Sequence, residues 1–161
     1  MKENSKELVI VESPTKAKTI GGFLGRKFRC IASNGHIRDL PKYQFGVDIS
    51  TFEPHYVVPR QKTKIANQIK KLASEAGNVY IATDEDREGE AIGWHILEIA
   101  KPKSYKRISF HEITKTAIMD ALKHPREINS MLVEAQEARR ILDRVVGYRL
   151  SPLLSKKIAR G

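Results

Sequence analysis

Acidic side chains are concentrated in one short segment of an otherwise basic chain. The 161 residues carry a formal net charge of +10, yet residues 84–90, DEDREGE, hold five acids and one arginine. Carboxylates held together repel one another unless a cation lies between them. Asp84, Asp86 and Glu88 therefore predict a site for Mg²⁺, a hard ion that takes oxygen ligands. The alternative is an ordinary acidic first turn of a solvated helix.

A second group of candidate site residues lies near the start of the chain. Glu12 ends the apolar segment ELVIVE, and Ser13 and Pro14 follow as the expected cap and first residue of a helix. Lys16 then falls in the first turn, where the helix dipole disfavours a cation. A phosphate bound at this helix N-terminus would offset that cost, so we expect an anion beside Lys16. A solvated lysine is the alternative.

Paired arginines occur in a third segment, EARRILDRVVGYRL, at residues 137–150. On a helix, Arg140 and Arg144 project together, opposite an apolar face. A bridging phosphate would remove their mutual repulsion, because a guanidinium group binds phosphate in a bidentate manner. Residues 139–160 carry seven basic side chains and one acid, which predicts salt-dependent DNA binding. The alternative is a solvated face on which Glu137 partly neutralises Arg140.

Short apolar segments alternate with segments of helical period, which is typical of an α/β fold with a mostly parallel sheet flanked by helices. The sequence predicts strands at 7–12, 28–33, 78–83 and 107–110, and helices at 14–24, 65–76, 91–99, 115–123 and from 129 onward. Ligands bind beyond the carboxyl ends of parallel strands. Glu12 and Asp84 each follow such an end, so we expect them to meet at one edge of the sheet.

Other potentially reactive residues give weaker signals. His36 lies in the loop after the second predicted strand and could reach the same edge of the sheet, although a structural role is the alternative. Cys30 is the only cysteine, which excludes an internal disulfide. None of the five tyrosines has a neighbouring base or fixed arginine that would mark a nucleophile.

Composition and charge narrow the class of protein. The longest apolar runs are far short of the ~20 residues needed to cross a bilayer, so we expect a cytoplasmic protein. The basic charge favours nucleic acid over membrane as a polyanionic partner. We expect residues 1–6 to be disordered. Helical sequence continues to Gly161 without a stop signal, so we expect a truncated chain.

Five blocks, taken together, resemble the amino-terminal part of the bacterial DNA topoisomerase I family of type IA topoisomerases. The blocks are LVIVESPTKAKTI, SNGHIRDLP, ATDEDREGEAIGWH, FHEIT and ARRILDRVVGYRLSPLL. The resemblance implies a Toprim domain with a Rossmann-like sheet over residues 7–128. It also implies that residues 129–161 begin a helical domain that binds single-stranded DNA.

The resemblance further implies roles for individual residues. Glu12 corresponds to an active-site glutamate that binds metal and is placed for proton transfer, and Lys16 to a lysine near the scissile phosphate. Asp84, Asp86 and Glu88 correspond to the acidic triad that binds Mg²⁺. Positions that correspond to DNA contacts or to basic residues near the active site are His36, Arg107, Arg139, Arg140, Ile141, Arg144, Arg149 and Lys156.

The implied reaction is relaxation of negatively supercoiled DNA through a 5′-phosphotyrosine intermediate, without ATP, by a nucleoid-associated enzyme. The family's nucleophilic tyrosine lies beyond Gly161, so we expect this chain alone neither to cleave nor to relax DNA. Two alternatives remain at this stage. A Toprim nuclease would use a metal-activated water instead of tyrosine, and a pure nucleic-acid-binding module would hold no metal.

Overall fold

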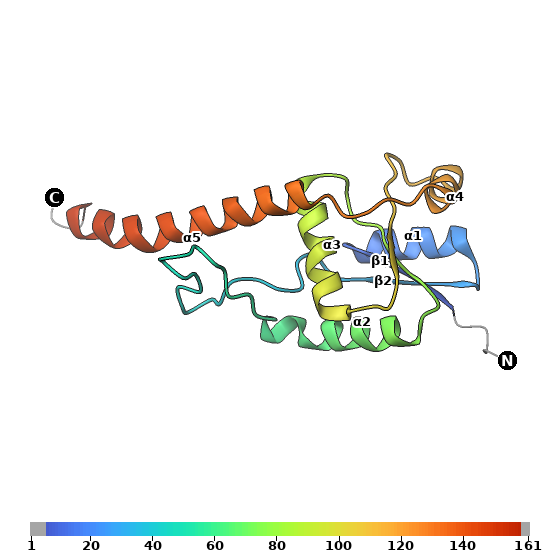
Figure 1. Cartoon of the computed structure of the whole chain (residues 1–161), viewed down its shortest axis with the longest axis horizontal. Helices are drawn as coiled ribbons and strands as arrows, with labels where there is room; N and C mark the ends of the chain where they lie inside the picture. Colours follow the sequence, from blue (N-terminus) through green and yellow to red (C-terminus); the bar gives the residue numbers. More distant parts are fainter. Residues whose placement is uncertain (1–5, 159–161) are drawn as a thin grey trace.

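A parallel sheet forms the centre of the chain (Figure 1). The structure is a computed structural model that describes residues 6–158. The predicted disorder of residues 1–6 lies outside this range except at Lys6, as does Arg160 of the basic segment. The strands are β1 (Glu7–Val11), β2 (Phe28–Ala32), β3 (Val79–Ile81) and β4 (Tyr105–Arg107). Their order is β2-β1-β3-β4, and every neighbouring pair is parallel, as the sequence predicts.

The fourth strand lies earlier in the chain than the predicted 107–110. Tyr105 pairs with Val79, so the strand begins before the predicted segment. The Ile108 N–H donates to the carbonyl of Ile81, the last residue of β3. Because β3 ends there, the residues after Ile108 have no strand to pair with. The strand is therefore fixed by its partner rather than by its own apolar pattern.

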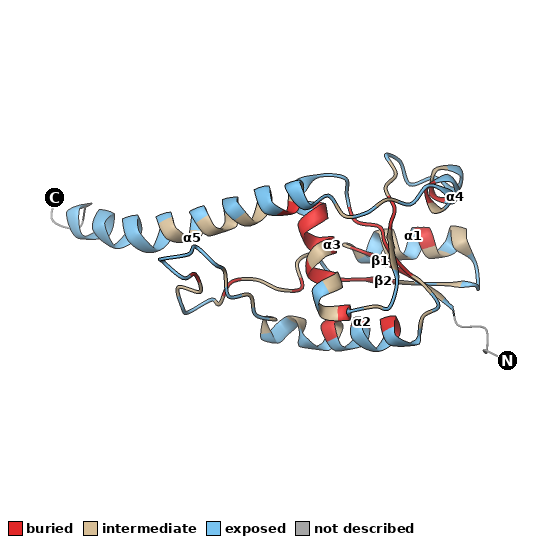
Figure 2. Cartoon of the chain, viewed as in Figure 1, coloured by how far each residue is buried: buried red, intermediate tan, exposed pale blue. Residues whose placement is uncertain are grey.

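Four helices cover the two faces of the sheet. They are α1 (Pro14–Leu24), α2 (Thr63–Glu75, preceded by the short η1, Arg60–Lys62), α3 (Arg87–Ala100) and α4 (Lys115–Lys123). Successive side chains of a strand point to opposite faces. Leu8 and Ile10 accordingly pack in the core with α2 and α3, whereas Val9 and Val11 pack with α1 and α4. Figure 2 shows the buried residues gathered along the strands and in the first turns of α3.

Both ends of α1 follow the predicted local signals. Ser13 has an extended backbone and its Oγ accepts a hydrogen bond of 3.3 Å from the Lys16 N–H. Pro14 is the first helical residue, where its missing N–H costs nothing. Gly25 ends the helix with a φ of 71°, a conformation that glycine adopts without strain. The N-terminal cap fixes where the chain turns from Glu12, just after β1, into the first turn of α1, which carries Lys16.

Replacing Ser13 with alanine should lower the free energy of unfolding by about 1 kcal/mol, because the Lys16 N–H loses its acceptor. Urea denaturation followed by circular dichroism measures this difference. The exposed Ser104, which caps no helix, supplies the matched control Ser104→Ala. Equal stability of the two variants would contradict the assigned cap.

The last helix, α5 (Ser130–Ile158), extends away from the sheet (Figure 1). Asn129 begins it, since its Oδ1 accepts from the Leu132 N–H at 3.2 Å. Val133 is buried near the contact with α3, whereas the second half of α5 is exposed (Figure 2). No helix within residues 6–158 is long and apolar enough to cross a membrane.

Candidate active site

The carboxyl ends of β1 and β3 carry the predicted site residues to one place. The two strands are neighbours, and Ile10 pairs with Ile81 close to their ends. Glu12 follows β1, and Asp84 lies in the loop after β3. The Lys16 ammonium group donates from Nζ to Glu12 Oε1 and, at 2.5 Å, to Asp84 Oδ1. Lys16 therefore links Glu12 to Asp84, two acids that are distant in sequence and that the strand pattern predicts at one edge of the sheet.

Lys16 is held between these two carboxylates. Its side chain is 21% exposed, so it is not the solvated lysine of the alternative interpretation. Burial alone would lower the pKa of Lys16, but hydrogen bonds to Asp84 and Glu12 outweigh burial and raise the pKa above its usual value. Lys16 is therefore positively charged, and the anions that offset its position in the helix dipole are protein carboxylates.

Asp86 and Glu88 lie at the start of α3. Asp86 is the N-cap, and its Oδ1 accepts from the Gly89 N–H at 2.7 Å. Glu88 is in the first turn, and its Oε1 lies 3.6 Å from His36 Nε2. Within the described residues, no group of three or more His, Cys, Asp or Glu side chains is gathered closely enough to hold a metal ion.

The side chains nevertheless fit a hard divalent cation. Glu12 Oε2 is buried and has no hydrogen-bond partner among the described residues. A buried carboxylate oxygen without a partner is costly, so such an atom is suited to a cation ligand. Asp84 and Glu88 have side chains that are 60% and 63% exposed, and they lie at the rim where an ion can enter. All of these donors are oxygen atoms, which is the set that Mg²⁺ takes.

Glu90, the last acid of the segment, is buried rather than part of the exposed group. Its Oε1 accepts from Arg107 Nε at 3.0 Å and from Arg126 Nη2 at 2.5 Å. Its Oε2 accepts from the backbone N–H of Asn129 at 2.9 Å. Burial alone would raise the pKa of Glu90, but the hydrogen bonds from Arg126, Asn129 and Arg107 outweigh burial and lower the pKa. Glu90 is therefore a buried carboxylate ion between two guanidinium groups.

Arg107 lies behind the acidic loop. Its side chain is 0% exposed. Nη1 donates to the carbonyls of Ile81 and Ile108, and Nη2 donates to Glu90 and, at 2.8 Å, to the Asp84 carbonyl. The resemblance implies a DNA-contacting role for Arg107, but the structure gives it no exposed surface for DNA. The reason is that its donors are engaged by a buried carboxylate and by backbone carbonyls.

Gly89 allows α3 to begin directly against the acidic loop. A Cβ atom at this position would lie 2.0 Å from the Asp84 carbonyl oxygen. The Gly89 carbonyl accepts from Thr83 Oγ1 at 2.7 Å. The Asp84 carbonyl is therefore enclosed between the Gly89 Cα and the Arg107 guanidinium group.

One known protein family matches the part of the chain that contains the sheet, the helices α1 to α3 and the acidic loop after β3. The family described as "Toprim domain" matches residues 7–113. The chain belongs to the Toprim family. The predicted fold class, an α/β Toprim fold with a parallel sheet flanked by helices, is thereby confirmed.

Two relatives extend the Toprim match along the chain. "DNA topoisomerase 1" of Campylobacter jejuni is 56% identical over 160 residues, which cover 97% of this chain and 23% of the relative. Full-length topoisomerase I from Thermotoga maritima, in a monoclinic crystal form, superposes with a TM-score of 0.86 and 52% identity over 92% of this chain and 26% of that one. These matches confirm the resemblance to bacterial topoisomerase I. The chain spans about a quarter of the length of either relative.

In this Toprim chain, two arginines of α5 hold the loop that follows β2. Arg140 binds Asp39 through two hydrogen bonds of 2.9 Å. Burial alone would raise the pKa of Asp39, but the hydrogen bonds from Arg140 and from a backbone N–H lower it. Arg144 Nη1 donates to the carbonyls of Pro41 at 2.6 Å and Gln44 at 2.7 Å. The two arginines therefore project together, as predicted, but toward the protein.

The apolar face of α5 is divided: Ile141 and Val145 are half-buried, whereas Leu142 and Val146 lie toward solvent. Leu142 is 60% exposed and Val146 is 44% exposed. Arg140 and Arg144 occupy the inner side because the loop at 39–44 offers them a carboxylate and carbonyls, which the sequence of α5 cannot reveal. The other α5 residues implied to contact DNA are Arg139, Arg149 and Lys156, which are exposed, and Ile141, which is half-buried.

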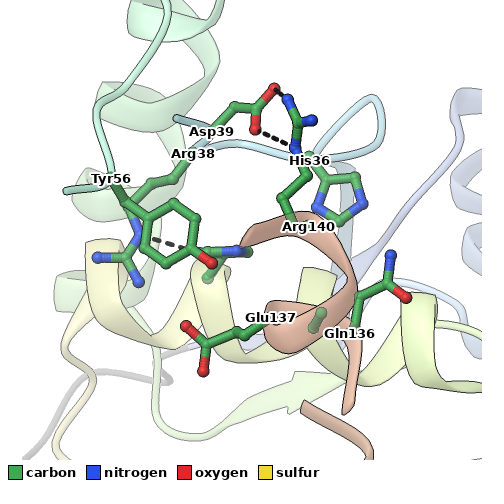
Figure 3. A pocket seen from close by; sticks show the side chains of 9 residues that line it. His36, Arg38, Asp39, Tyr56, Gln136, Glu137 and Arg140 are labelled. Atoms are coloured by element: carbon green, nitrogen blue, oxygen red, sulfur yellow. Dashed lines mark hydrogen bonds and ion pairs between the residues drawn. The ribbon is translucent and has the colours of Figure 1, made fainter. Parts of the chain in front are cut away.

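A cavity of about 120 Å³ lies beside the Toprim acidic loop, between α3, α5 and the loop after β2 (Figure 3). His36 lines it and connects it to Glu88. Arg38 Nε donates to His95 Nδ1 at 3.1 Å. Burial lowers the pKa of His95 to about 3, with Arg38 and His36 adding to the effect, so the ring is neutral. His95 is therefore a packed, neutral histidine of α3, as its helical position suggests.

Three residues that shape the site escaped the sequence analysis: Asp39, Glu90 and Arg126. Glu90 is one of five acids in seven residues, and no periodicity separates it from its exposed neighbours. Asp39 and Arg126 lie in loops, and their roles depend on ion pairs with Arg140 and Glu90, which are far away in the sequence. No local signal in the sequence identifies them.

Proposed function

We propose that the chain is the metal- and DNA-binding part of a longer type IA DNA topoisomerase. Such an enzyme relaxes negatively supercoiled DNA without ATP. A tyrosine attacks one strand, a 5′-phosphotyrosine bond holds the end while another strand passes, and the attack is then reversed. The observation that carries the proposal is the meeting of Glu12, Lys16 and Asp84 in a Toprim chain that is 56% identical to a DNA topoisomerase 1.

We propose that Glu12, Asp84, Asp86 and Glu88 hold a divalent ion, Mg²⁺. The support is the set of oxygen donors, the buried and unpaired Glu12 Oε2, and the exposed carboxylates at the rim. When bound, the ion would neutralise phosphate charge beside the reacting bond. Glu12 would also move a proton at its carboxylate, and Lys16 would hold the scissile phosphate through its ammonium group.

The proposed nucleophile is a tyrosine of the longer enzyme that is not among these residues. An attacking tyrosine needs a nearby base or a lowered pKa. Burial instead raises the pKa of Tyr56, Tyr80 and Tyr105. Tyr43 is exposed, and Tyr148 packs edge-on against a phenylalanine of the loop after β2. The chain alone is therefore expected not to cleave DNA.

The proposed partner is a single-stranded segment of underwound DNA. The exposed arginines and lysines of α5 supply positive charge along one helix, and His36 lies beside Glu88 at the acidic loop. Arg140 and Arg144 already hold the loop after β2, so we propose that they shape this surface as well as contact DNA. The proposed DNA contacts are His36, Arg139, Arg140, Ile141, Arg144, Arg149 and Lys156.

We further infer two parts within the chain, a Toprim domain at 7–128 and the start of a helical DNA-binding domain at 129–161. The support is the change from strand-helix alternation to one long helix at Ser130. Residues 159–161 lie outside the described range. A DNA-processing enzyme of this kind would be associated with the nucleoid.

A labelled single-stranded oligonucleotide tests this function directly. We expect the chain to bind it and not to cut it, with or without Mg²⁺. Binding should weaken by roughly tenfold or more between 50 and 200 mM salt, because several phosphates are neutralised by lysine and arginine. Fluorescence anisotropy measures the binding, and a denaturing gel measures any cutting.

Two variants and two outcomes give the test its controls. Arg139→Ala with Arg149→Ala should weaken binding and reduce the salt dependence, whereas Lys64→Ala with Lys70→Ala, exposed on α2 away from α5, should change neither by more than about twofold. Cutting that requires Mg²⁺ would instead support the nuclease. Absence of binding by the wild-type chain would remove the proposed DNA partner.

A further inference from the structure

Glu90 links the acidic loop to the start of α5 through buried hydrogen bonds. On one side, Glu90 binds Arg107 through two hydrogen bonds of 3.0 and 2.8 Å, and Arg107 Nη2 continues to the Asp84 carbonyl at 2.8 Å. On the other side, Glu90 accepts from the Asn129 N–H and from Arg126. One carboxylate therefore joins two segments that belong to different parts of the proposed site.

Asp84 depends on this link for its position. Its side chain is 60% exposed, so packing does little to hold the carboxylate, which accepts its hydrogen bond from the long side chain of Lys16. Its backbone carbonyl, in contrast, is enclosed by Gly89 and hydrogen-bonded to Arg107. The point from which the Asp84 carboxylate projects is therefore set by the guanidinium group of Arg107, whose own charged partner is Glu90.

We propose that Glu90 is a positioning residue that, through Arg107, holds Asp84 where the divalent ion binds. This inference rests on the metal site proposed above. Groups that orient metal ligands without touching the metal change metal affinity by about 10–100-fold when they are replaced. Two successive hydrogen bonds connect Glu90 to Asp84, one between Glu90 and Arg107 and one from Arg107 to the Asp84 carbonyl. We therefore expect a loss of metal affinity at the lower end of that range.

Loss of the Glu90 charge would leave two neighbouring guanidinium groups without their shared carboxylate. Arg107 is fully buried, and an unpaired buried charge is strongly unfavourable. Arg107 would have to move toward water or recruit other acceptors, and either change releases the Asp84 carbonyl. The backbone of Asp84 would then no longer hold the exposed Asp84 carboxylate at a fixed position, whereas the hydrophobic core around the sheet would be unchanged.

The test compares Glu90→Gln with Arg126→Met. Both variants break hydrogen bonds of the same buried carboxylate, but only Glu90→Gln interrupts the path through Arg107 to Asp84. Titration calorimetry with Mg²⁺, well below the melting temperature of each variant, should give about tenfold weaker binding for Glu90→Gln and a change of less than twofold for Arg126→Met. In metal-free protein, the carbonyl carbon resonance of Asp84 should shift in Glu90→Gln only, because Arg107 donates to this carbonyl whereas Arg126 reaches the loop at the Glu85 side chain, 3.8 Å away.

A second variant keeps the test decisive if Glu90→Gln does not fold. Glu90→Asp retains the charge but shortens the side chain by one methylene, so it cannot reach Arg107 and Asn129 together, and we expect about threefold to tenfold weaker Mg²⁺ binding. Wild-type Mg²⁺ affinity in a folded Glu90 variant, or an equal loss in Arg126→Met, would overturn the positioning role. If the wild-type chain binds no Mg²⁺, the proposed metal site fails, and the carbonyl carbon resonance of Asp84 alone decides whether Glu90 positions the loop.

Discussion

Conversion of both Asp84 and Asp86 to asparagine should weaken Mg²⁺ binding by roughly 100-fold, since direct ligands matter at least as much as the groups that orient them. Asparagine keeps the size of each side chain and removes the charge that a hard cation requires. The fold should survive, because asparagine caps a helix about as well as the aspartate that receives the Gly89 N–H. Titration calorimetry measures the affinity, and circular dichroism confirms the fold.

A charge-matched control separates ligand loss from a general change in charge. Asp120→Asn with Glu134→Gln removes two exposed acids of α4 and α5 that do not belong to the acidic loop, and Mg²⁺ affinity should stay within about twofold of wild type. Unchanged affinity in the Asp84 and Asp86 double variant would remove the metal-site proposal. The acids of the loop would then serve only as the first turn of α3.

Replacement of Gly89 with alanine should lower the free energy of unfolding by about 3 kcal/mol, at the upper end of the usual cost of overpacking. The new Cβ would lie 2.0 Å from the carbonyl oxygen, 2.6 Å from the carbonyl carbon and 2.9 Å from the Cα of Asp84. These are backbone atoms, so no side chain can rotate to make room. Urea denaturation followed by circular dichroism measures the loss.

The control for Gly89 has the opposite expected sign. Gly22, inside α1, has no neighbouring atom within 4 Å of the point where a Cβ would lie, so Gly22→Ala should stabilise the chain by about 0.5–1 kcal/mol through helix propensity. A stability of Gly89→Ala within about 0.5 kcal/mol of wild type would contradict the close approach of α3 to the acidic loop. It would also weaken the case that Gly89 and Arg107 hold the Asp84 carbonyl in place.

Structural features that depend on residues close together in the sequence, such as helix caps, were predictable. Ser13, Pro14 and Gly25 fix both ends of α1 because caps act within a few residues of the helix. The strand pattern predicts that Glu12 and Asp84 approach each other, because parallel strands of one sheet end at a common edge. The position of Lys16 against the helix dipole predicts a neighbouring anion, and the structure places the Glu12 and Asp84 carboxylates there, whereas the expected phosphate stays a prediction.

Features that depend on distant partners were not predictable. β4 is placed by its pairing with β3, and the apolar segment RISF alone indicates the wrong span. Arg140 finds its carboxylate at Asp39, 101 positions away. Arg107 resembles one more surface cation in a basic sequence, and only the three-dimensional structure reveals that Glu90 draws it into the interior.

The long helix α5 is held by the rest of the protein up to Tyr148, and its last described part projects freely as a cantilever. Its 29 residues span about 43 Å at a rise of ~1.5 Å per residue. The Glu90 carboxylate fixes the residue before its first turn, and Tyr148 packs against Phe45 of the loop after β2. Beyond Tyr148, about 15 Å of exposed helix overhangs. Arg140 and Arg144 also hold α5 to the loop after β2, so bending is confined to the overhang. A tilt of a few degrees there moves the basic side chains at its end by roughly 1 Å.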